Sequence, residues 1–230
     1  MNESLQTVYT AGSGVALQQR NRVLRNTYWL LALSLLPTVL GAWVGVGTGV
    51  MARMGVGMSA IIFLAGAFGF IFAIEKTKDS AAGVGVLLAF TFFMGLMLSR
   101  LLAAVLGFRN GTSLIMTAFG GTAGVFLAMA MLSSVIKRDL SGMGKFLFVG
   151  AVMLLVAGII NIFVQSSAMM LTLSVIAIGL FSAFLLYDIK RIVDGGETNY
   201  VSATLAIYLD LYNIFQSLLV LLGFAGGERE

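Results

Sequence analysis

Two aspartates placed in long apolar segments are the side chains best suited to chemistry in this sequence. Asp188 ends one segment, within Leu-Leu-Tyr-Asp-Ile-Lys-Arg, and Asp210 lies inside the next, within Tyr-Leu-Asp-Leu-Tyr-Asn. A charge at the centre of a lipid bilayer costs about 2.5 to 3.5 kcal/mol on insertion scales, so carboxylates are rarely found there without a function. Because Gly195 and Gly196 allow a hairpin between the two segments, we expect the two carboxyl groups to meet.

An acidic pair of this kind would respond to protons. Two carboxylates held close together cannot both ionise at low cost, so they share a proton and titrate as a unit. When both are ionised, Asp188 and Asp210 would offer hard oxygen ligands for transient contact with Ca²⁺. Simpler interpretations stay open, in which Asp188 caps a helix end and pairs with Lys190 or Arg191, and Asp210 bonds a neighbouring hydroxyl.

Other polar side chains are candidates to support this pair. Asn213 and Ser217 lie three and seven residues after the second aspartate, so all three share one helical face that should turn toward protein or water. Arg100 lies inside an earlier apolar segment, where it either extends to the membrane interface or pairs with polar groups between helices. Lys76 and Lys78 belong to a mixed run of charges, which is either a solvated loop or part of a gate.

The composition indicates a membrane protein. Hydrophobic residues make up 59% of the 230 residues and charged residues 10%, whereas a soluble domain carries about 25% charged residues. Cysteine and histidine are both absent, which removes disulfides, thiolate nucleophiles, Cys/His zinc sites and the usual catalytic pairs with histidine. We therefore expect no enzyme activity and no cofactor. Nucleic-acid binding is not expected either, because the basic residues lie mainly in short connectors.

Seven apolar segments are long enough to cross a bilayer as helices. About 20 apolar residues span the hydrocarbon layer as an α-helix, and each segment is of that order. We predict an all-α integral membrane protein, with helices near residues 28–50, 55–74, 82–107, 112–136, 146–165, 168–187 and 202–224. The domains are then a polar cytoplasmic tail at 1–27 and a transmembrane domain at 28–226.

The distribution of positive charge predicts the orientation of these helices. Cytoplasmic connectors of membrane proteins carry an excess of Lys and Arg. Ten of the 14 Lys and Arg residues lie on the side of the N-terminal tail, and the opposite side holds Arg53, Arg109 and Arg229. We therefore expect the N-terminus in the cytoplasm and the C-terminus outside, which requires an odd number of crossings.

The 28 glycines fall mostly within the predicted spans and indicate closely packed helices. Gly41 with Gly45, and Gly120 with Gly124, have the four-residue spacing that lets helix backbones approach each other in lipid. We expect both pairs to lie at helix–helix contacts within one bundle. The lone proline, Pro37, should kink the first helix modestly.

Five stretches together carry a family resemblance. They are Val-Leu-Arg-Asn-Thr-Tyr at 23–28, Lys-Arg-Asp-Leu-Ser at 137–141, Asn-Ile-Phe at 161–163, Gly-Gly-Glu-Thr-Asn-Tyr at 195–200 and Tyr-Leu-Asp-Leu-Tyr-Asn-Ile-Phe at 208–215. On these stretches the chain resembles the Bax inhibitor-1/YccA family, also called the transmembrane Bax inhibitor motif family, over nearly everything after residue 20. The resemblance is strongest to the proteobacterial YccA branch.

This resemblance implies a seven-helix bundle in the bacterial inner membrane, with the last helix surrounded by the other six. It implies a pH-sensitive, passive calcium leak channel whose gate is a pair of aspartates, matched here by Asp188 and Asp210. In such channels a basic residue at the end of the second span holds one aspartate in the closed state, and Lys76 and Lys78 are the candidates. The YccA branch implies another role, modulation of the FtsH membrane protease, for which residues 1–27 would be a disordered handle.

Overall fold

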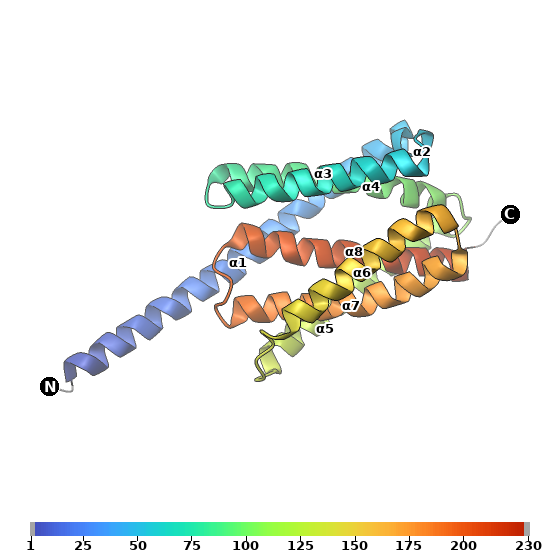
Figure 1. Cartoon of the computed structure of the whole chain (residues 1–230). Helices are drawn as coiled ribbons and strands as arrows, with labels where there is room; N and C mark the ends of the chain where they lie inside the picture. The colour runs from blue at the N-terminus through green and yellow to red at the C-terminus, as the bar shows by residue number, and fades with distance from the viewer. Residues whose placement is uncertain (1–2, 228–230) are drawn as a thin grey trace.

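The computed structural model describes residues 3–227 and, from residue 18 onward, their side chains. Within this range the chain is helical and contains no strand, as the sequence predicts (Figure 1). Seven of its helices are long and apolar enough to cross a membrane, and a short helix links the first of them to the second. The helices are α1 (Glu3–Thr48), α2 (Val50–Arg53), α3 (Val56–Thr77), α4 (Ala81–Leu106), α5 (Gly111–Val135), α6 (Met143–Val164), α7 (Ser167–Val193) and α8 (Tyr200–Gly226).

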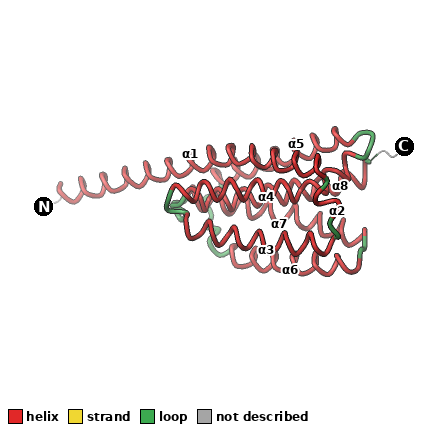
Figure 2. The backbone as a smooth tube through the Cα atoms, turned by 90° about the horizontal axis from the view of Figure 1, so that it is seen from above, coloured by secondary structure: helices red, strands yellow, loops and turns green. Residues whose placement is uncertain are grey.

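The long helices form a bundle whose connections gather at two ends (Figure 2). The α3–α4, α5–α6 and α7–α8 connections lie at the end from which α1 projects, and the C-terminus lies at the other end (Figure 1). In a bilayer every backbone N–H and C=O group must be bonded within the protein, and an α-helix does this within a single segment. The continuous apolar runs of the sequence therefore fold as spanning helices.

The predicted bounds agree with most observed helices to within a few residues. The sixth span differs, because α7 continues to Val193 and does not end near residue 187. The basic residues Lys190 and Arg191 look like the end of a membrane segment, but Ile189 and Ile192 on either side of them are buried and extend the packed face of the helix. Asp188 therefore lies more than one turn inside α7 and not at its end.

α1 begins at Glu3 and runs without interruption into the first span, so the backbone of residues 3–27 is helical. The expectation of a disordered tail is wrong for this stretch. Its N-terminal half projects beyond the other helices (Figures 1 and 2). The sequence Ala-Leu-Gln-Gln-Arg-Asn-Arg at 16–22 is rich in good helix formers, and a span that is already helical supplies the nucleus for extension.

One of the two predicted glycine contacts is confirmed and the other is wrong. A Cβ atom added to Gly41 would overlap the carbonyl oxygen of Phe92, and one added to Gly45 would overlap the side chain of Ser99, so these glycines pack α1 directly on α4. Gly120 and Gly124 are different, because a Cβ atom added at either would meet no atom within 4 Å. Only the first pair therefore brings two helices together.

α8 is the most enclosed of the seven spans. In its most apolar stretch 44% of the residues are buried, against 6% in α3 and 6% in α6. It packs against α7, α5, α1 and α4. Its buried side chains include Ile207, Leu219 and the polar Asp210. The polar face of this helix therefore turns toward protein, as its sequence pattern predicts.

Candidate functional site

Asp188 on α7 and Asp210 on α8 are neighbours, and their carboxyl groups form a hydrogen bond. The two helices pack against each other as a hairpin, as the sequence predicts. Asp210 is 4% exposed, and its Oδ2 atom has no hydrogen-bond partner in the described part of the chain. Since no hydroxyl bonds to this aspartate there, the simpler interpretation of Asp210 is wrong. A hydrogen bond between two carboxyl groups requires a proton on one of them, so the pair can hold one proton between two helices.

The basic residues that follow Asp188 are paired with other acids. Lys190 Nζ lies 2.6 Å from Asp194 Oδ1, and a guanidinium nitrogen of Arg191 lies 3.0 Å from Glu197 Oε2. Asp188 therefore neither caps the helix nor takes one of these bases as its ion-pair partner, and that interpretation is wrong. The hydrogen bond of its carboxyl group is formed with Asp210.

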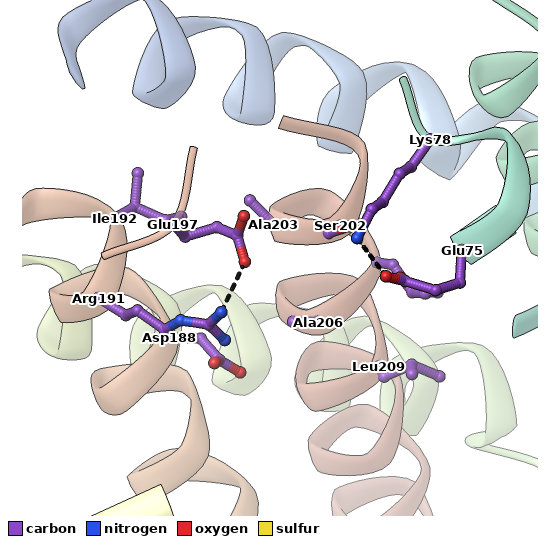
Figure 3. Close-up of a pocket in the computed structure, with 11 residues that line it drawn as sticks. Glu75, Lys78, Asp188, Arg191, Ile192, Glu197, Ser202, Ala203, Ala206 and Leu209 are labelled. Atoms are coloured by element: carbon purple, nitrogen blue, oxygen red, sulfur yellow. Dashed lines mark hydrogen bonds and ion pairs between the residues drawn. The ribbon is translucent and has the colours of Figure 1, made fainter. Parts of the chain in front are cut away.

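A cavity of about 330 Å³ lies beside Asp188, between the C-terminal end of α3, the end of α7 and the start of α8 (Figure 3). Apolar side chains of α8 form part of its wall. Its charged lining residues are Glu75, Lys78, Asp188, Arg191 and Glu197. The cavity therefore places charged groups from α3 and from the α7–α8 hairpin around one of the two aspartates.

Two ion pairs border this cavity (Figure 3). Lys78 pairs with Glu75 on the α3 side, and the hydrogen bond that it donates to Glu75 raises the pKa of Lys78 above its ordinary value. On the other side Arg191 pairs with Glu197. Among the described residues Lys78 forms its ion pair with Glu75 and with neither aspartate, so the structure brings this lysine to the cavity but not to the acidic pair.

The other candidate side chains make their observed contacts with groups other than the aspartates. Lys76 Nζ lies over the Phe72 ring, 4.6 Å from its centroid, and this lysine does not line the cavity. Arg100 donates a hydrogen bond of 3.0 Å to the carbonyl oxygen of Met54, so it fastens the α2–α3 connection to α4. The Asn213 side chain donates a 2.8 Å hydrogen bond to the carbonyl oxygen one turn earlier in its own helix. The structure therefore shows Lys76 and Asn213 in contacts within their own helices and Arg100 in a contact between helices.

The turn between α7 and α8 contains functional candidates that the sequence interpretation missed. Glu197 Oε1 accepts hydrogen bonds from the backbone N–H groups of Thr198, at 3.0 Å, and Asn199, at 2.9 Å. The side chain of Asn199 caps α8 and also donates to Asp79 Oδ1 at 2.8 Å. The sequence pattern Gly-Gly-Glu-Thr-Asn, in which an Asn precedes a helix, is the signal that could have identified a built turn instead of a flexible one.

Two buried tyrosines fix the opposite side of α8. The Tyr208 hydroxyl lies 2.9 Å from the Thr38 hydroxyl of α1, and the Tyr212 hydroxyl donates to the carbonyl oxygen of Met94 on α4 at 3.3 Å. Residues two apart on a helix do not share a face. Because each tyrosine is two residues from Asp210, these bonds to α1 and α4 turn the aspartate toward α7.

The acidic pair is a poor resting site for a metal ion. Ca²⁺ takes six to eight oxygen ligands. Within the described residues no group of three or more acidic side chains is arranged to hold a metal ion.

Several known bacterial proteins are similar in sequence to this chain over most of its length. The model of the family described as "Inhibitor of apoptosis-promoting Bax1" (Bax1-I) matches residues 20–227. A membrane protein of Vibrio cholerae is 39% identical over 209 residues, which cover 89% of this chain and 90% of that protein. The Escherichia coli K12 protein named "Modulator of FtsH protease YccA" is 37% identical over 213 residues, covering 93% and 94%. A second Escherichia coli relative with the same identity and coverage is named "Inner membrane protein YccA". Together with seven apolar helices, these relatives identify a multi-pass protein of the bacterial inner membrane.

Proposed function

Because this chain belongs to the Bax1-I family, as its sequence motifs predict, we propose that it is a passive, pH-sensitive pathway for Ca²⁺ whose gate is the Asp188–Asp210 pair. The observation that carries the proposal is the hydrogen bond between two carboxyl groups of neighbouring helices, one of them almost fully buried. The charged cavity beside Asp188 supports it, since a cation could reach the pair from there. The proposal requires neither a cofactor nor enzymatic chemistry.

The proton on the pair controls the pathway in this proposal. With one shared proton, the carboxyl groups hold α7 and α8 together and the pathway is closed. When the proton leaves, two negative charges face each other, and at 4 Å their repulsion amounts to about 4 kcal/mol at an effective dielectric constant near 20. The helices then separate and expose two carboxylates to a passing cation. Ca²⁺ flux should therefore rise as the pH rises.

The orientation in the membrane is part of the same proposal. The N-terminus lies in the cytoplasm and the C-terminus outside, which is supported by the ten Lys and Arg residues on the side of the N-terminal tail. The charged cavity then opens toward the cytoplasm. α8 is the central helix of the bundle, supported by its high buried fraction and by its contacts with α1, α4, α5 and α7.

Calcium flux into liposomes that contain the purified protein tests the proposal. For the wild-type protein we expect flux to increase between about pH 6 and pH 8. In Asp210→Asn the amide keeps a hydrogen bond to Asp188 but cannot ionise, so flux should stay low at every pH. Asp139→Asn is the control, because it also removes one carboxylate at this end of the bundle but lies in the exposed α5–α6 connection, outside the cavity. Equal leak through the wild type and Asp210→Asn over the whole range would end the proposal.

A second function has its own support. One relative is named a modulator of FtsH protease, and we propose that this chain also acts on that protease through the projecting N-terminal part of α1. This part extends beyond the bundle and so offers a cytoplasmic protease a helix to contact (Figure 1). Deletion of residues 1–17, which precede the first span, should lengthen the half-life of the chain in cells that contain FtsH. An unchanged half-life would argue against this contact.

A further inference from the structure

The Arg191 guanidinium lies between two carboxylates, and it pairs with only one of them. Arg191 and Asp188 are three residues apart on α7, so they share a face of the helix, and their charges interact. The ion pair of Arg191 is nevertheless formed with Glu197, at 3.0 Å, and none with Asp188 is present among the described residues. Figure 3 shows the guanidinium turned toward Glu197, with the Asp188 carboxylate beside it.

Glu197 is held in place by the backbone of its own turn. Its Oε1 atom accepts hydrogen bonds from the N–H groups of Thr198 and Asn199, which leaves Oε2 for the guanidinium. The N–H groups of Gly196 and Glu197 donate to the carbonyl oxygen of Arg191 at 2.8 and 3.2 Å, so the turn folds back onto this residue. The side chain of Glu197 is only 16% exposed. The position of the carboxylate is therefore set by the turn and not by the arginine.

We propose that Glu197 is a positioning residue that withholds Arg191 from Asp188 and thereby leaves the Asp188 carboxyl group free to bond Asp210. This inference rests on the proposed cation pathway and adds a control on its gate. Without the negative charge of Glu197, Arg191 would turn to Asp188, which lies three residues earlier on the same face of α7 and already interacts with its charge. In the open state, when both aspartates are ionised, a guanidinium on Asp188 would neutralise one of the two carboxylates that face a passing cation, so cation flux would fall.

Among the described residues, the other acids near the cavity already have partners or are buried. Glu75 is already paired with Lys78 across the cavity, and Asp210 is buried against α7. Asp194 is paired with Lys190. Asp188 is therefore the acid to which a released Arg191 would turn.

Calcium flux through Glu197→Gln in liposomes tests the inference. The amide oxygen of Gln can still accept the two backbone hydrogen bonds, so the turn is kept and only the ion pair is lost. We expect flux at pH 8, where the pathway is open, to fall roughly threefold to fivefold, the size that a partly exposed ion pair can supply. The double variant Arg191→Gln/Glu197→Gln should recover wild-type flux, because no guanidinium remains to cover Asp188. Asp139→Asn, which removes an exposed carboxylate outside the cavity, should leave flux unchanged.

A full recovery in the double variant supports the inference, because a merely structural role of Glu197 would not be repaired by removing its partner. Wild-type flux in Glu197→Gln, or a loss that Arg191→Gln does not repair, overturns it. Thermal unfolding in detergent supplies a second readout without flux. A double-mutant cycle gives the coupling free energy of unfolding between Asp188→Asn and Arg191→Gln. This coupling should be small in the wild-type background and larger in the Glu197→Gln background. Equal coupling free energies in both backgrounds overturn the inference. This outcome does not depend on the flux assay, so it can be told apart from a failure of the proposed calcium pathway.

Discussion

Gly95→Ala tests whether the close approach of α1 to α4 holds the site together. A Cβ atom added at Gly95 would overlap the carbonyl oxygen of Thr38 and would lie 2.8 Å from its carbonyl carbon and 2.9 Å from the Ala42 nitrogen. Real Cβ atoms essentially never approach other atoms below 3.0 Å. All three neighbours are backbone atoms of α1, so no side-chain rotation can relieve the overlap. The substitution must therefore push α1 away from α4.

The size of this effect can be isolated with a matched control on the same helix. Inserting an atom into a packed contact costs about 1 to 3 kcal/mol, while replacing Gly by Ala within a helix gains up to about 1 kcal/mol. Gly85→Ala has the same gain and no clash, because a Cβ atom there meets no atom within 4 Å. We expect the Tm of Gly95→Ala to lie roughly 2 to 12 °C below that of Gly85→Ala.

Thermal unfolding of the two purified variants in detergent measures this difference. The consequence should extend to the site, because the Thr38 hydroxyl bonds the Tyr208 hydroxyl at 2.9 Å and Tyr208 is two residues from Asp210. Gly95→Ala should therefore also weaken the pH dependence of calcium flux, whereas Gly85→Ala should not. Equal Tm values for the two variants would refute the argument that backbone contact between α1 and α4 positions α8.

Three further predictions follow from the contacts around the site. Lys78→Gln should raise calcium flux, because it removes a positive charge from the cavity lining, whereas Lys76→Gln, with the same charge change outside the cavity, should have no effect in the same liposome assay. Tyr208→Phe should lower the free energy of unfolding by about 0.6 kcal/mol, the mean for a hydrogen bond between membrane helices, measured by thermal or denaturant unfolding; no loss would mean that the hydroxyl contributes nothing. Hydrogen bonds from the N–H and hydroxyl groups of Ser141 lower the pKa of Asp139 below 3.8. The ionised Asp139 carboxylate therefore stabilises the folded chain above pH 3.8, and this stabilisation is lost as the pH falls through the lowered pKa. Ser141→Ala should raise the pKa of Asp139 toward 3.8 in an NMR titration, and an unchanged pKa would contradict the assignment.

The spans and the meeting of the two aspartates were predictable because both depend on local properties. Hydropathy along the chain identifies the helices, and a short turn forces the segments of Asp188 and Asp210 to return side by side. The end of α7 was not predictable by the same means. Basic residues normally mark the membrane interface, but here Lys190 is buried and paired with Asp194, so the helix continues past them.

The amino-acid sequence by itself determined seven apolar helices, their alternating direction and an acidic side chain on each member of the last hairpin. It also limited the possible chemistry, since cysteine and histidine are absent. The tertiary structure alone decided which acid each base takes, with Lys78 on Glu75 and Arg191 on Glu197. It also decided which glycine pair lies at a contact. The physical reason is that hydropathy and spacing act along one helix, whereas ion pairs and backbone contacts depend on how neighbouring helices are rotated and on separations of a few ångströms.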